Sequence, residues 1–123
     1  MRPKISLFLA LLFLLLVTVS QAAPATLTTD EAKNHIGETA TVCGIAMSVH
    51  YAASSKGRPT FVNLDKPYPN TVFTILIWGD DLPKFSPKPN TWETKRVCAT
   101  GTITSYRGAP EIVAKSLSQI EVK

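Results

Sequence analysis

The chain has 123 residues, of which 45% are hydrophobic and 18% are charged, and it contains nine prolines and only two cysteines. This composition is typical of one globular domain, and it excludes a multidomain enzyme, a disordered chain and a disulfide-dense chain. The formal net charge is +4.

The first 22 residues have the three parts of a secretory signal peptide. Arg2 and Lys4 precede an apolar or small run from Ile5 to Val19, and small residues precede a cut after Ala22. The alternative is an uncleaved membrane anchor, but this run is shorter than the roughly 20 residues that a spanning helix needs. We therefore expect a periplasmic or secreted protein whose mature domain covers residues 23–123.

Cleavage would lower the net charge of the protein. It removes two of the 13 basic residues and none of the nine acidic ones, so 11 basic residues remain and the mature charge is +2. A charge this small is weak support for a polyanionic partner, and any such partner must be argued from where the charges lie.

Cys43 and Cys98 are expected to form a disulfide, because two cysteines of an exported protein pair more often than they bind metal. On the chain-entropy view, a bridge that closes a loop of this length is worth roughly 4 kcal/mol. Structural zinc would need two more ligands, and His35 and His50 have no recognisable spacing. We expect no metal and no cofactor.

One short helix is expected at residues 29–36. Thr28 and Glu31 have the spacing of a capping box, and Gly37 is a typical C-terminal stop.

Five segments rich in β-branched and apolar residues follow, separated by turn-forming residues. Gly44 is expected to form a bulge or bend in the first of them. Residues 79–95 are expected to be irregular, with at most one helical turn near residues 80–85. Five short strands favour a closed or partly closed barrel, because a sandwich would normally need seven or more. The predicted strands are Thr39–Val49, Thr60–Leu64, Thr71–Trp78, Arg96–Ser105 and Glu111–Lys115.

The order of several short motifs resembles the OB-fold nucleic-acid-binding domain, of the type found in anticodon-binding domains, helicase wedge domains and the large subunit of exonuclease VII. The resemblance covers about residues 38–120 and implies an all-β, five-stranded Greek-key barrel that binds single-stranded nucleic acid. Those domains are intracellular and usually belong to larger modules, whereas this chain is expected to be exported and to stand alone. The motifs are Val42–Ile45, Thr60–Asp65, Phe73–Trp78, Arg96–Ile103 and Tyr106–Ile112.

In the OB arrangement the strands that carry the two cysteines are neighbours. Each cysteine has a threonine two residues away, at Thr41 and Thr100. Both cysteines could therefore lie on a shared face at bridging distance.

Strand parity places Val62 on one face of its strand, and Phe61 and Asn63 on the other. Because Asn63 is costly to bury unpaired, the Val62 face should be core and Phe61 should lie outside as a stacking platform for bases. The alternative is that a bulge reverses the parity, or that the N-terminal segment covers Phe61. The resemblance implies that Phe73 lies beside Phe61, although both sides of its strand are apolar and composition leaves its burial open.

Two loops bring aromatic and basic residues to the edges of this face. Tyr51, Lys56 and Arg58 lie in the loop after the first strand, and Tyr106 and Arg107 lie in the loop before the last one. In the OB architecture these loops flank the ligand face, so their rings and cations would converge on it. The alternative is that the cations are ordinary solvated loop residues.

The resulting functional hypothesis is an exported module, not an enzyme, that binds single-stranded nucleic acid. The alternative is an envelope module that binds a protein or a small ligand. A nuclease is a third possibility, but Asp80 and Asp81 are more typical of a turn, and no Gly-x-Ser-x-Gly motif occurs. The candidate binding residues are Tyr51, Lys56, Arg58, Phe61, Asn63, Phe73, Tyr106 and Arg107.

Overall fold

The computed structural model describes residues 17–18 and 22–123. The predicted signal peptide, residues 1–22, therefore lies outside the described residues except for Val17, Thr18 and Ala22. In the described part of the chain, no helix is both long enough and apolar enough to cross a membrane.

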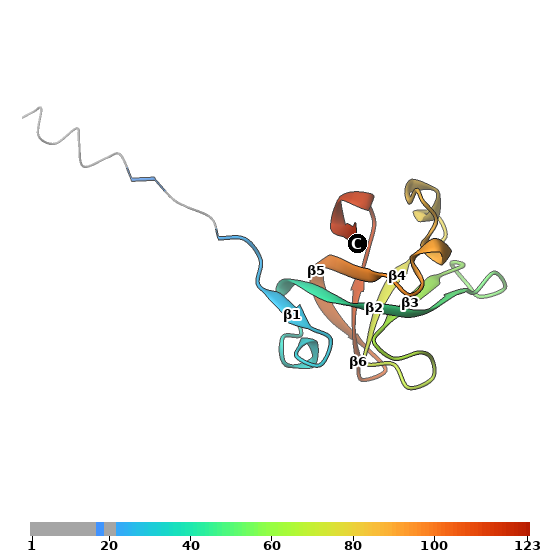
Figure 1. The fold of residues 1–123 in the computed structure, drawn as a ribbon, viewed down its shortest axis with the longest axis horizontal. Helices are drawn as coiled ribbons and strands as arrows, with labels where there is room; N and C mark the ends of the chain where they lie inside the picture. The colour runs from blue at the N-terminus through green and yellow to red at the C-terminus, as the bar shows by residue number, and fades with distance from the viewer. Residues whose placement is uncertain (1–16, 19–21) are drawn as a thin grey trace, which may run out of the picture.

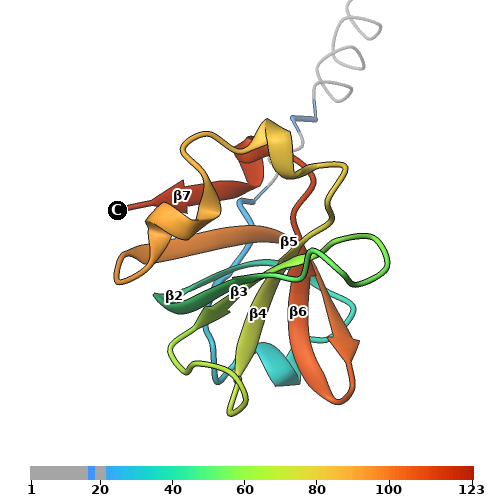
Figure 2. The ribbon, with the colours of Figure 1, turned by 90° about the vertical axis from the view of Figure 1, so that its right-hand side faces the viewer.

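The described residues form seven strands and four short 3-10 helices, and they contain no α-helix. The strands form one sheet in the order β1-β2-β3-β4-β6-β5-β7, and β2 also pairs with β5, so the sheet closes partly into a ring (Figures 1 and 2). The strands are β1 (Thr26–Thr28), β2 (Thr39–Tyr51), β3 (Thr60–Leu64), β4 (Phe73–Ile77), β5 (Arg96–Tyr106), β6 (Ala109–Val113) and β7 (Ile120–Val122). The 3-10 helices are η1 (Ala32–Asn34), η2 (Leu82–Lys84), η3 (Pro89–Trp92) and η4 (Leu117–Gln119).

The five predicted strands correspond to β2 through β6, and the prediction missed β1 and β7. Each of these two has only three residues, too few for a visible alternation. β1 pairs in parallel with β2, and β7 pairs antiparallel with β5. Both therefore extend the sheet beside the seam where β2 meets β5, β1 along β2 (Figure 1) and β7 along β5 (Figure 2).

The predicted helix at 29–36 is wrong, because only the three-residue η1 forms there. The capping box itself exists: the Thr28 N–H donates to Glu31 Oε1 at 2.9 Å, and the Glu31 N–H donates to Thr28 Oγ1 at 3.3 Å. However, Thr29 is buried and its hydroxyl donates to Asp65 at 2.6 Å. Tertiary contacts therefore hold this segment, which is too short to be stable as a helix by itself.

The bend in β2 differs in detail from the prediction. The register shift lies between Ala46 and Ser48, not at Gly44. Gly44 has another role, since a Cβ there would lie 2.8 Å from a carboxylate oxygen of Asp65. The same carboxylate accepts a hydrogen bond from the Ile45 N–H at 2.8 Å. Glycine is thus required so that Asp65 can approach the strand.

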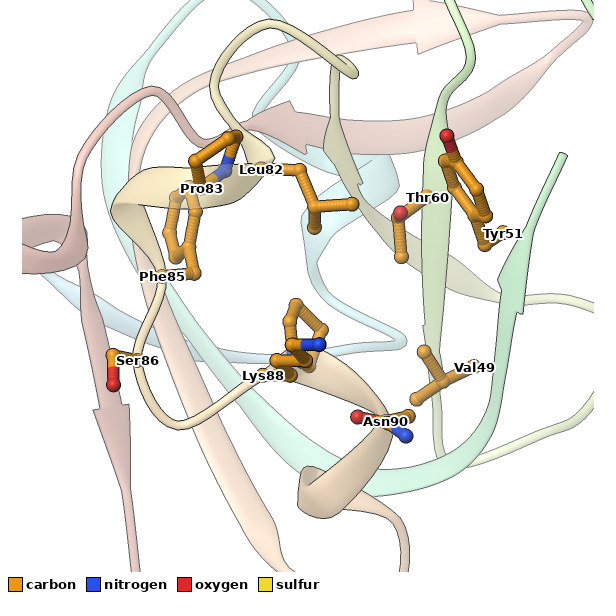
Figure 3. A pocket seen from close by; sticks show the side chains of 10 residues that line it. Val49, Tyr51, Thr60, Leu82, Pro83, Phe85, Ser86, Lys88 and Asn90 are labelled. Carbon is orange, nitrogen blue, oxygen red and sulfur yellow. The ribbon is translucent and has the colours of Figure 1, made fainter. Parts of the chain in front are cut away.

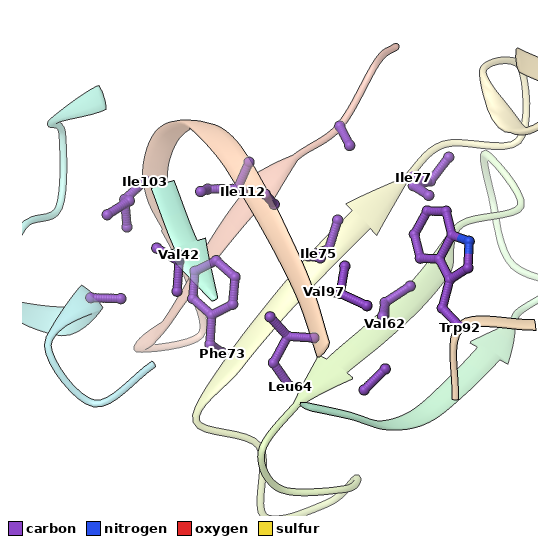
Figure 4. Close-up of a cluster of buried hydrophobic side chains, with 14 of the residues drawn as sticks. Val42, Val62, Leu64, Phe73, Ile75, Ile77, Trp92, Val97, Ile103 and Ile112 are labelled. Atoms are coloured by element: carbon purple, nitrogen blue, oxygen red, sulfur yellow. The ribbon is translucent and has the colours of Figure 1, made fainter. Parts of the chain in front are cut away.

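The core lies inside the ring, where alternate residues of the strands meet (Figure 4). Trp92 of η3 is only 1% exposed and contacts Phe85 edge to face, with the ring centroids 6.2 Å apart. The connection at 79–95, predicted to be irregular, therefore supplies two aromatic side chains to the core. The largest fully buried side chains are those of Trp92, Phe73, Leu64, Ile75, Ile77, Ile103, Ile112, Val42, Val62 and Val97.

The predicted disulfide is confirmed. Cys43 of β2 and Cys98 of β5 stand directly opposite each other, with an S–S distance of 2.08 Å. Thr41 and Thr100 form the next pair on the same face of the sheet, and their hydroxyl oxygens are 2.6 Å apart. The bridge therefore fastens the seam that closes the ring.

Removing this bridge should strongly destabilise the protein. The cysteines are 55 residues apart, so the loss of the cross-link in the Cys43→Ala, Cys98→Ala variant should cost about 4 kcal/mol. Thermal unfolding with and without reductant measures the effect: reductant should lower the melting temperature of the wild type and leave that of the variant unchanged. Equal melting temperatures for oxidised wild type and variant would contradict this role.

Candidate ligand-binding face and pocket

Two rows of side chains cross the strands on the side of the sheet that faces away from the core. We call the surface formed by these rows the outer face. The strand registers place a polar row, Ser48, Asn63, Thr74, Glu111 and Thr104, next to a more apolar row, His50, Phe61, Leu76 and Val113.

The parity predicted for β3 agrees with the structure. Val62 and Leu64 are fully buried in the core, and Phe61 lies half-buried on the outer face between His50 and Leu76. The alternation of the strand thus leaves part of the Phe61 ring available to a ligand.

Asn63 lies on the outer face but is only 3% exposed. Its amide nitrogen donates to Ser48 Oγ at 2.9 Å, and its amide oxygen accepts from Thr74 Oγ1 at 2.8 Å. The expectation that Asn63 contacts a ligand is therefore corrected. Its polar groups are already paired within the sheet, and it links β2, β3 and β4.

Phe73 does not lie beside Phe61, which corrects the placement implied by the resemblance. Phe73 stands opposite Leu64 and is fully buried in the core, with no exposed surface. Since Leu64 points inward, its cross-strand partner must point inward as well. The apolar residues on both sides of β4 hid this from the sequence.

The aromatic residue on the outer side of β4 is Trp78, which follows the last residue of the strand and lies two residues beyond Leu76. Trp78 is 41% exposed, and its ring lies so close to Gly57 that a Cβ there would be 2.8 Å from Trp78 Cε3. The Gly79 N–H donates to the Gly57 carbonyl at 2.9 Å. These contacts hold the loop between β2 and β3 against Trp78. The parity of β4 could have identified Trp78 once Phe73 was assigned to the core.

Two cations of the same loop lie at this end of β4. Lys56 and Arg58 are exposed, and the Arg58 guanidinium is 3.3 Å from Asp80. An exposed pair of this kind contributes little, about 0–1 kcal/mol, so Arg58 can exchange Asp80 for another anion at small cost. We call Trp78, Lys56 and Arg58 the Trp78 cluster.

Tyr106 and Arg107 form a second cluster at the other end of the outer face, here called the Tyr106 cluster. The parallel register of β4 and β6 places the β5–β6 turn beside the start of β4. Tyr106 is 54% exposed, and the Arg107 guanidinium lies over its ring at 5.3 Å from the centroid, a favourable cation–π contact.

The two loops therefore flank the outer face, as expected, but they do not converge on one point. The Trp78 cluster lies at the end of β4 and the Tyr106 cluster beside its start. β4 has five residues, which at about 3.3 Å per residue separates the clusters by roughly 16 Å.

Tyr51 does not belong to the outer face. It pairs with Thr60, and both residues line a pocket of about 720 Å³ between the β2–β3 pair and the segment that carries η2 and η3 (Figure 3). The expectation that Tyr51 joins Phe61 is corrected by strand alternation, because His50 is the β2 residue opposite Phe61. The pocket is lined by Val49, Tyr51, Thr60, Leu82, Pro83, Phe85, Ser86, Lys88, Pro89 and Asn90.

The adjacent acids Asp80 and Asp81 form separate ion pairs. Asp80 contacts Arg58, and Asp81 accepts a hydrogen bond from Lys84 at 2.7 Å. Among the described residues, no group of three or more His, Cys, Asp or Glu side chains is arranged to hold a metal ion.

Glu111 lies in the middle of the polar row, between Thr74 and Thr104. Burial raises the pKa of its carboxyl group, since a carboxylate loses hydration there. The sequence reasoning did not identify Glu111 as part of this face.

The ring of strands and its outer face define a small all-β domain of OB type, and comparisons with solved structures agree. An OBody, AM1L10, bound to hen egg-white lysozyme aligns with a TM-score of 0.53 and 18% identity, over 85% of this chain and 98% of the OBody chain. A second OBody bound to lysozyme, AM2EP06, aligns with a TM-score of 0.51 and 15% identity, over 84% of this chain and 96% of its own.

A protein described as an aspartyl-tRNA synthetase, from Leishmania major Friedlin, aligns with a TM-score of 0.50 and 10% identity, over 87% of this chain. This chain spans only 22% of the synthetase. No protein-family model and no curated protein sequence matches the chain. At these identities the likeness shows the fold alone, and it supports the OB-type fold that the sequence predicted.

Replacing Glu111 by Gln should stabilise the protein at neutral pH. The pKa of this carboxyl is higher in the folded state than in the unfolded state, where it has the ordinary Glu pKa of about 4. The free energy of unfolding of the wild type therefore falls as the pH rises from that ordinary pKa through the pKa of the folded state. The melting temperature of Glu111→Gln should therefore exceed that of the wild type at pH 7, and the difference should vanish at a pH below about 4. A difference that is independent of pH would contradict the assignment to Glu111 ionisation.

Proposed function

We propose that this protein is an exported binding module, not an enzyme, that holds single-stranded nucleic acid across its outer face. The observation that carries the proposal is the pairing of exposed aromatic and basic side chains at both ends of that face. Trp78 lies with Lys56 and Arg58 at one end, and Tyr106 lies under Arg107 at the other.

The chemistry of single strands fits these two clusters. Bases stack on aromatic side chains with roughly 1–3 kcal/mol per base, and lysine and arginine neutralise the phosphates between them. Phe61, half-buried between the clusters, would support a third base. A path of roughly 16 Å along β4 suits a strand of a few nucleotides, within the range of about 4–16 nucleotides per OB fold.

The proposed compartment is the periplasm or the exterior of the cell. The Cys43–Cys98 bridge fits such a location, because disulfides persist in oxidising compartments and are rare in the cytosol. The signal-peptide pattern of residues 1–22 supports the same location.

Protein binding by the outer face is the second candidate, and one observation favours it. Glu111 places a carboxylate in the middle of this face, where it would repel phosphate. The OBody neighbours, whose structures contain bound lysozyme, have a fold that can present a protein-binding surface. Under this hypothesis, single-stranded oligonucleotides would not bind.

The stacking residues can be tested by titrating the exported protein into labelled single-stranded DNA and RNA and following fluorescence anisotropy. Phe61→Ala and Trp78→Ala should each weaken binding by roughly 1–3 kcal/mol. Tyr51→Ala is the matched control, since Tyr51 is 44% exposed but lines the pocket, and its affinity should equal that of the wild type. If the wild type binds neither strand, protein binding becomes the better hypothesis.

The phosphate contacts can be tested by the dependence of affinity on salt. Arg58→Ala and Arg107→Ala should each weaken binding at low salt and reduce the slope of log K against log salt by somewhat less than one, because each removes about one phosphate contact. Lys84→Ala is the control, because Lys84 is exposed but lies in η2, outside both clusters. Unchanged slopes in both arginine variants would place the phosphate path elsewhere.

A further inference from the structure

One acidic side chain lies on the outer face between the Trp78 cluster and the Tyr106 cluster. Glu111 of β6 stands opposite Thr74 of β4 and Thr104 of β5, in the middle of the polar row. It follows Ala109, the strand partner of Tyr106, by two residues, so it lies roughly 7 Å along β6 from the Tyr106 cluster. Figure 2 shows β6 beside β4. A nucleic-acid strand that contacts both clusters must therefore pass close to Glu111.

The Glu111 carboxylate is half-buried and has no charged partner in the described part of the chain. The four ion pairs found there involve other carboxylates, and the Thr104 hydroxyl donates at 3.4 Å to the backbone carbonyl of Glu111, not to its carboxylate. Burial therefore removes water from this carboxylate without replacing it, and this raises the pKa of the Glu111 carboxyl.

Few groups around Glu111 can titrate. The side chains beside it on β4 and β5 are threonines, and in the two rows of the outer face Glu111 is the one acid and His50 the one base. The charged and titratable groups on the elements packed against β6, or next to it in the chain, are Asp30, Lys33, Tyr106, Arg107 and Lys115. Asp30 is the one acid among them, and it is exposed. Glu111 is therefore the half-buried acid on the path between the clusters.

We propose that Glu111 makes the outer face an acid-strengthened site, which holds single-stranded nucleic acid more tightly when this carboxyl is protonated. The inference rests on the proposed function and concerns the regulation of the same site. The ionised carboxylate repels a phosphate held by Arg107, whereas the protonated carboxyl does not, and its O–H can donate a hydrogen bond. The proposed export brings the protein to the pH of its surroundings, so its affinity follows the acidity there.

Binding and protonation must strengthen each other. A phosphate beside Glu111 raises the pKa of its carboxyl further than burial alone does. The affinity therefore rises as the pH falls through the pKa of the complex, and it levels off below the pKa of the free protein, which is above the ordinary Glu pKa of about 4. At a charge separation of roughly 8 Å near a hydrated surface, the repulsion corresponds to a roughly three- to tenfold change in affinity at low salt.

The test measures the binding of labelled oligothymidylate without a terminal phosphate by fluorescence anisotropy, at low salt and at about pH 7.5 and about pH 5. Thymine gains no proton in this range, and carboxyls with the ordinary pKa of about 4 remain mostly ionised. Histidines commonly titrate in this range, so the parent protein for the comparison is the exported His50→Gln variant. This parent should bind roughly three- to tenfold more tightly at the lower pH.

Two further substitutions assign the effect to its residue. With Glu111→Gln added, binding at the higher pH should equal that of the parent at the lower pH, and the affinity should no longer change with pH. Glu121→Gln is the matched control, because Glu121 is an exposed acid of β7 that stands opposite Cys98, outside the two rows. It should leave the gain at the lower pH unchanged.

A second measurement follows the proton itself. A ¹³C NMR titration of the Glu111 carboxyl should show a higher midpoint in the complex with oligothymidylate than in the free protein.

The outcomes separate this inference from the proposed function. Equal affinity of the parent at both pH values, an equal gain after Glu111→Gln, or equal midpoints in the two titrations would overturn the inference and leave the proposed function standing. The absence of oligothymidylate binding at both pH values would overturn both.

Discussion

The pairing of β2 with β5 is the constraint on which the rest of the structure depends. β2 pairs with β5 through its first half and with β3 through its second half, so this one strand joins both sides of the ring. The Cys43–Cys98 bridge fastens the first half directly. If this seam opened, the strands β2-β3-β4-β6-β5 would no longer close into a ring, and the core inside the ring would be exposed to water. A small domain has little spare stability with which to hold such a seam by packing alone.

The change of partner along β2 depends on a second group, the carboxylate of Asp65. It accepts hydrogen bonds from the Ile45 N–H and the Thr29 hydroxyl, and the absent Cβ of Gly44 makes room for it. One side chain after β3 thus holds both the bend of β2 and the segment that follows β1. These hydrogen bonds are needed because backbone N–H groups at a bend lose their partners in the neighbouring strand. Apolar side chains cannot supply new hydrogen-bond partners, whereas the carboxylate can.

The alternation in β3 was sufficient to predict the outward position of Phe61, and the presence of only two cysteines behind a signal-peptide pattern was sufficient to predict the disulfide. The neighbouring position of β2 and β5 was implied by the resemblance to the OB fold. The same reasoning failed for Phe73, because β4 is apolar on both sides and alternation carries no signal there. It also failed for Tyr51 and Thr60, whose surroundings come from η2 and η3, far away in the sequence. A pocket of this kind depends on tertiary contacts of an irregular segment, and local patterns do not encode such contacts.

The two candidate sites share β2 and β3 but place different physical demands on a ligand. On the outer face the cations Lys56, Arg58 and Arg107 are exposed, so attraction to phosphate there is strongly screened by salt. The lining of the pocket is mainly aliphatic, aromatic or proline, and contacts with such side chains are little affected by the screening that weakens interactions between charges. Affinity that falls steeply with salt therefore belongs to the outer face, and affinity that survives high salt belongs to the pocket. Because adjacent residues of one strand pair serve opposite sides, a ligand in either site contacts strands that also support the other.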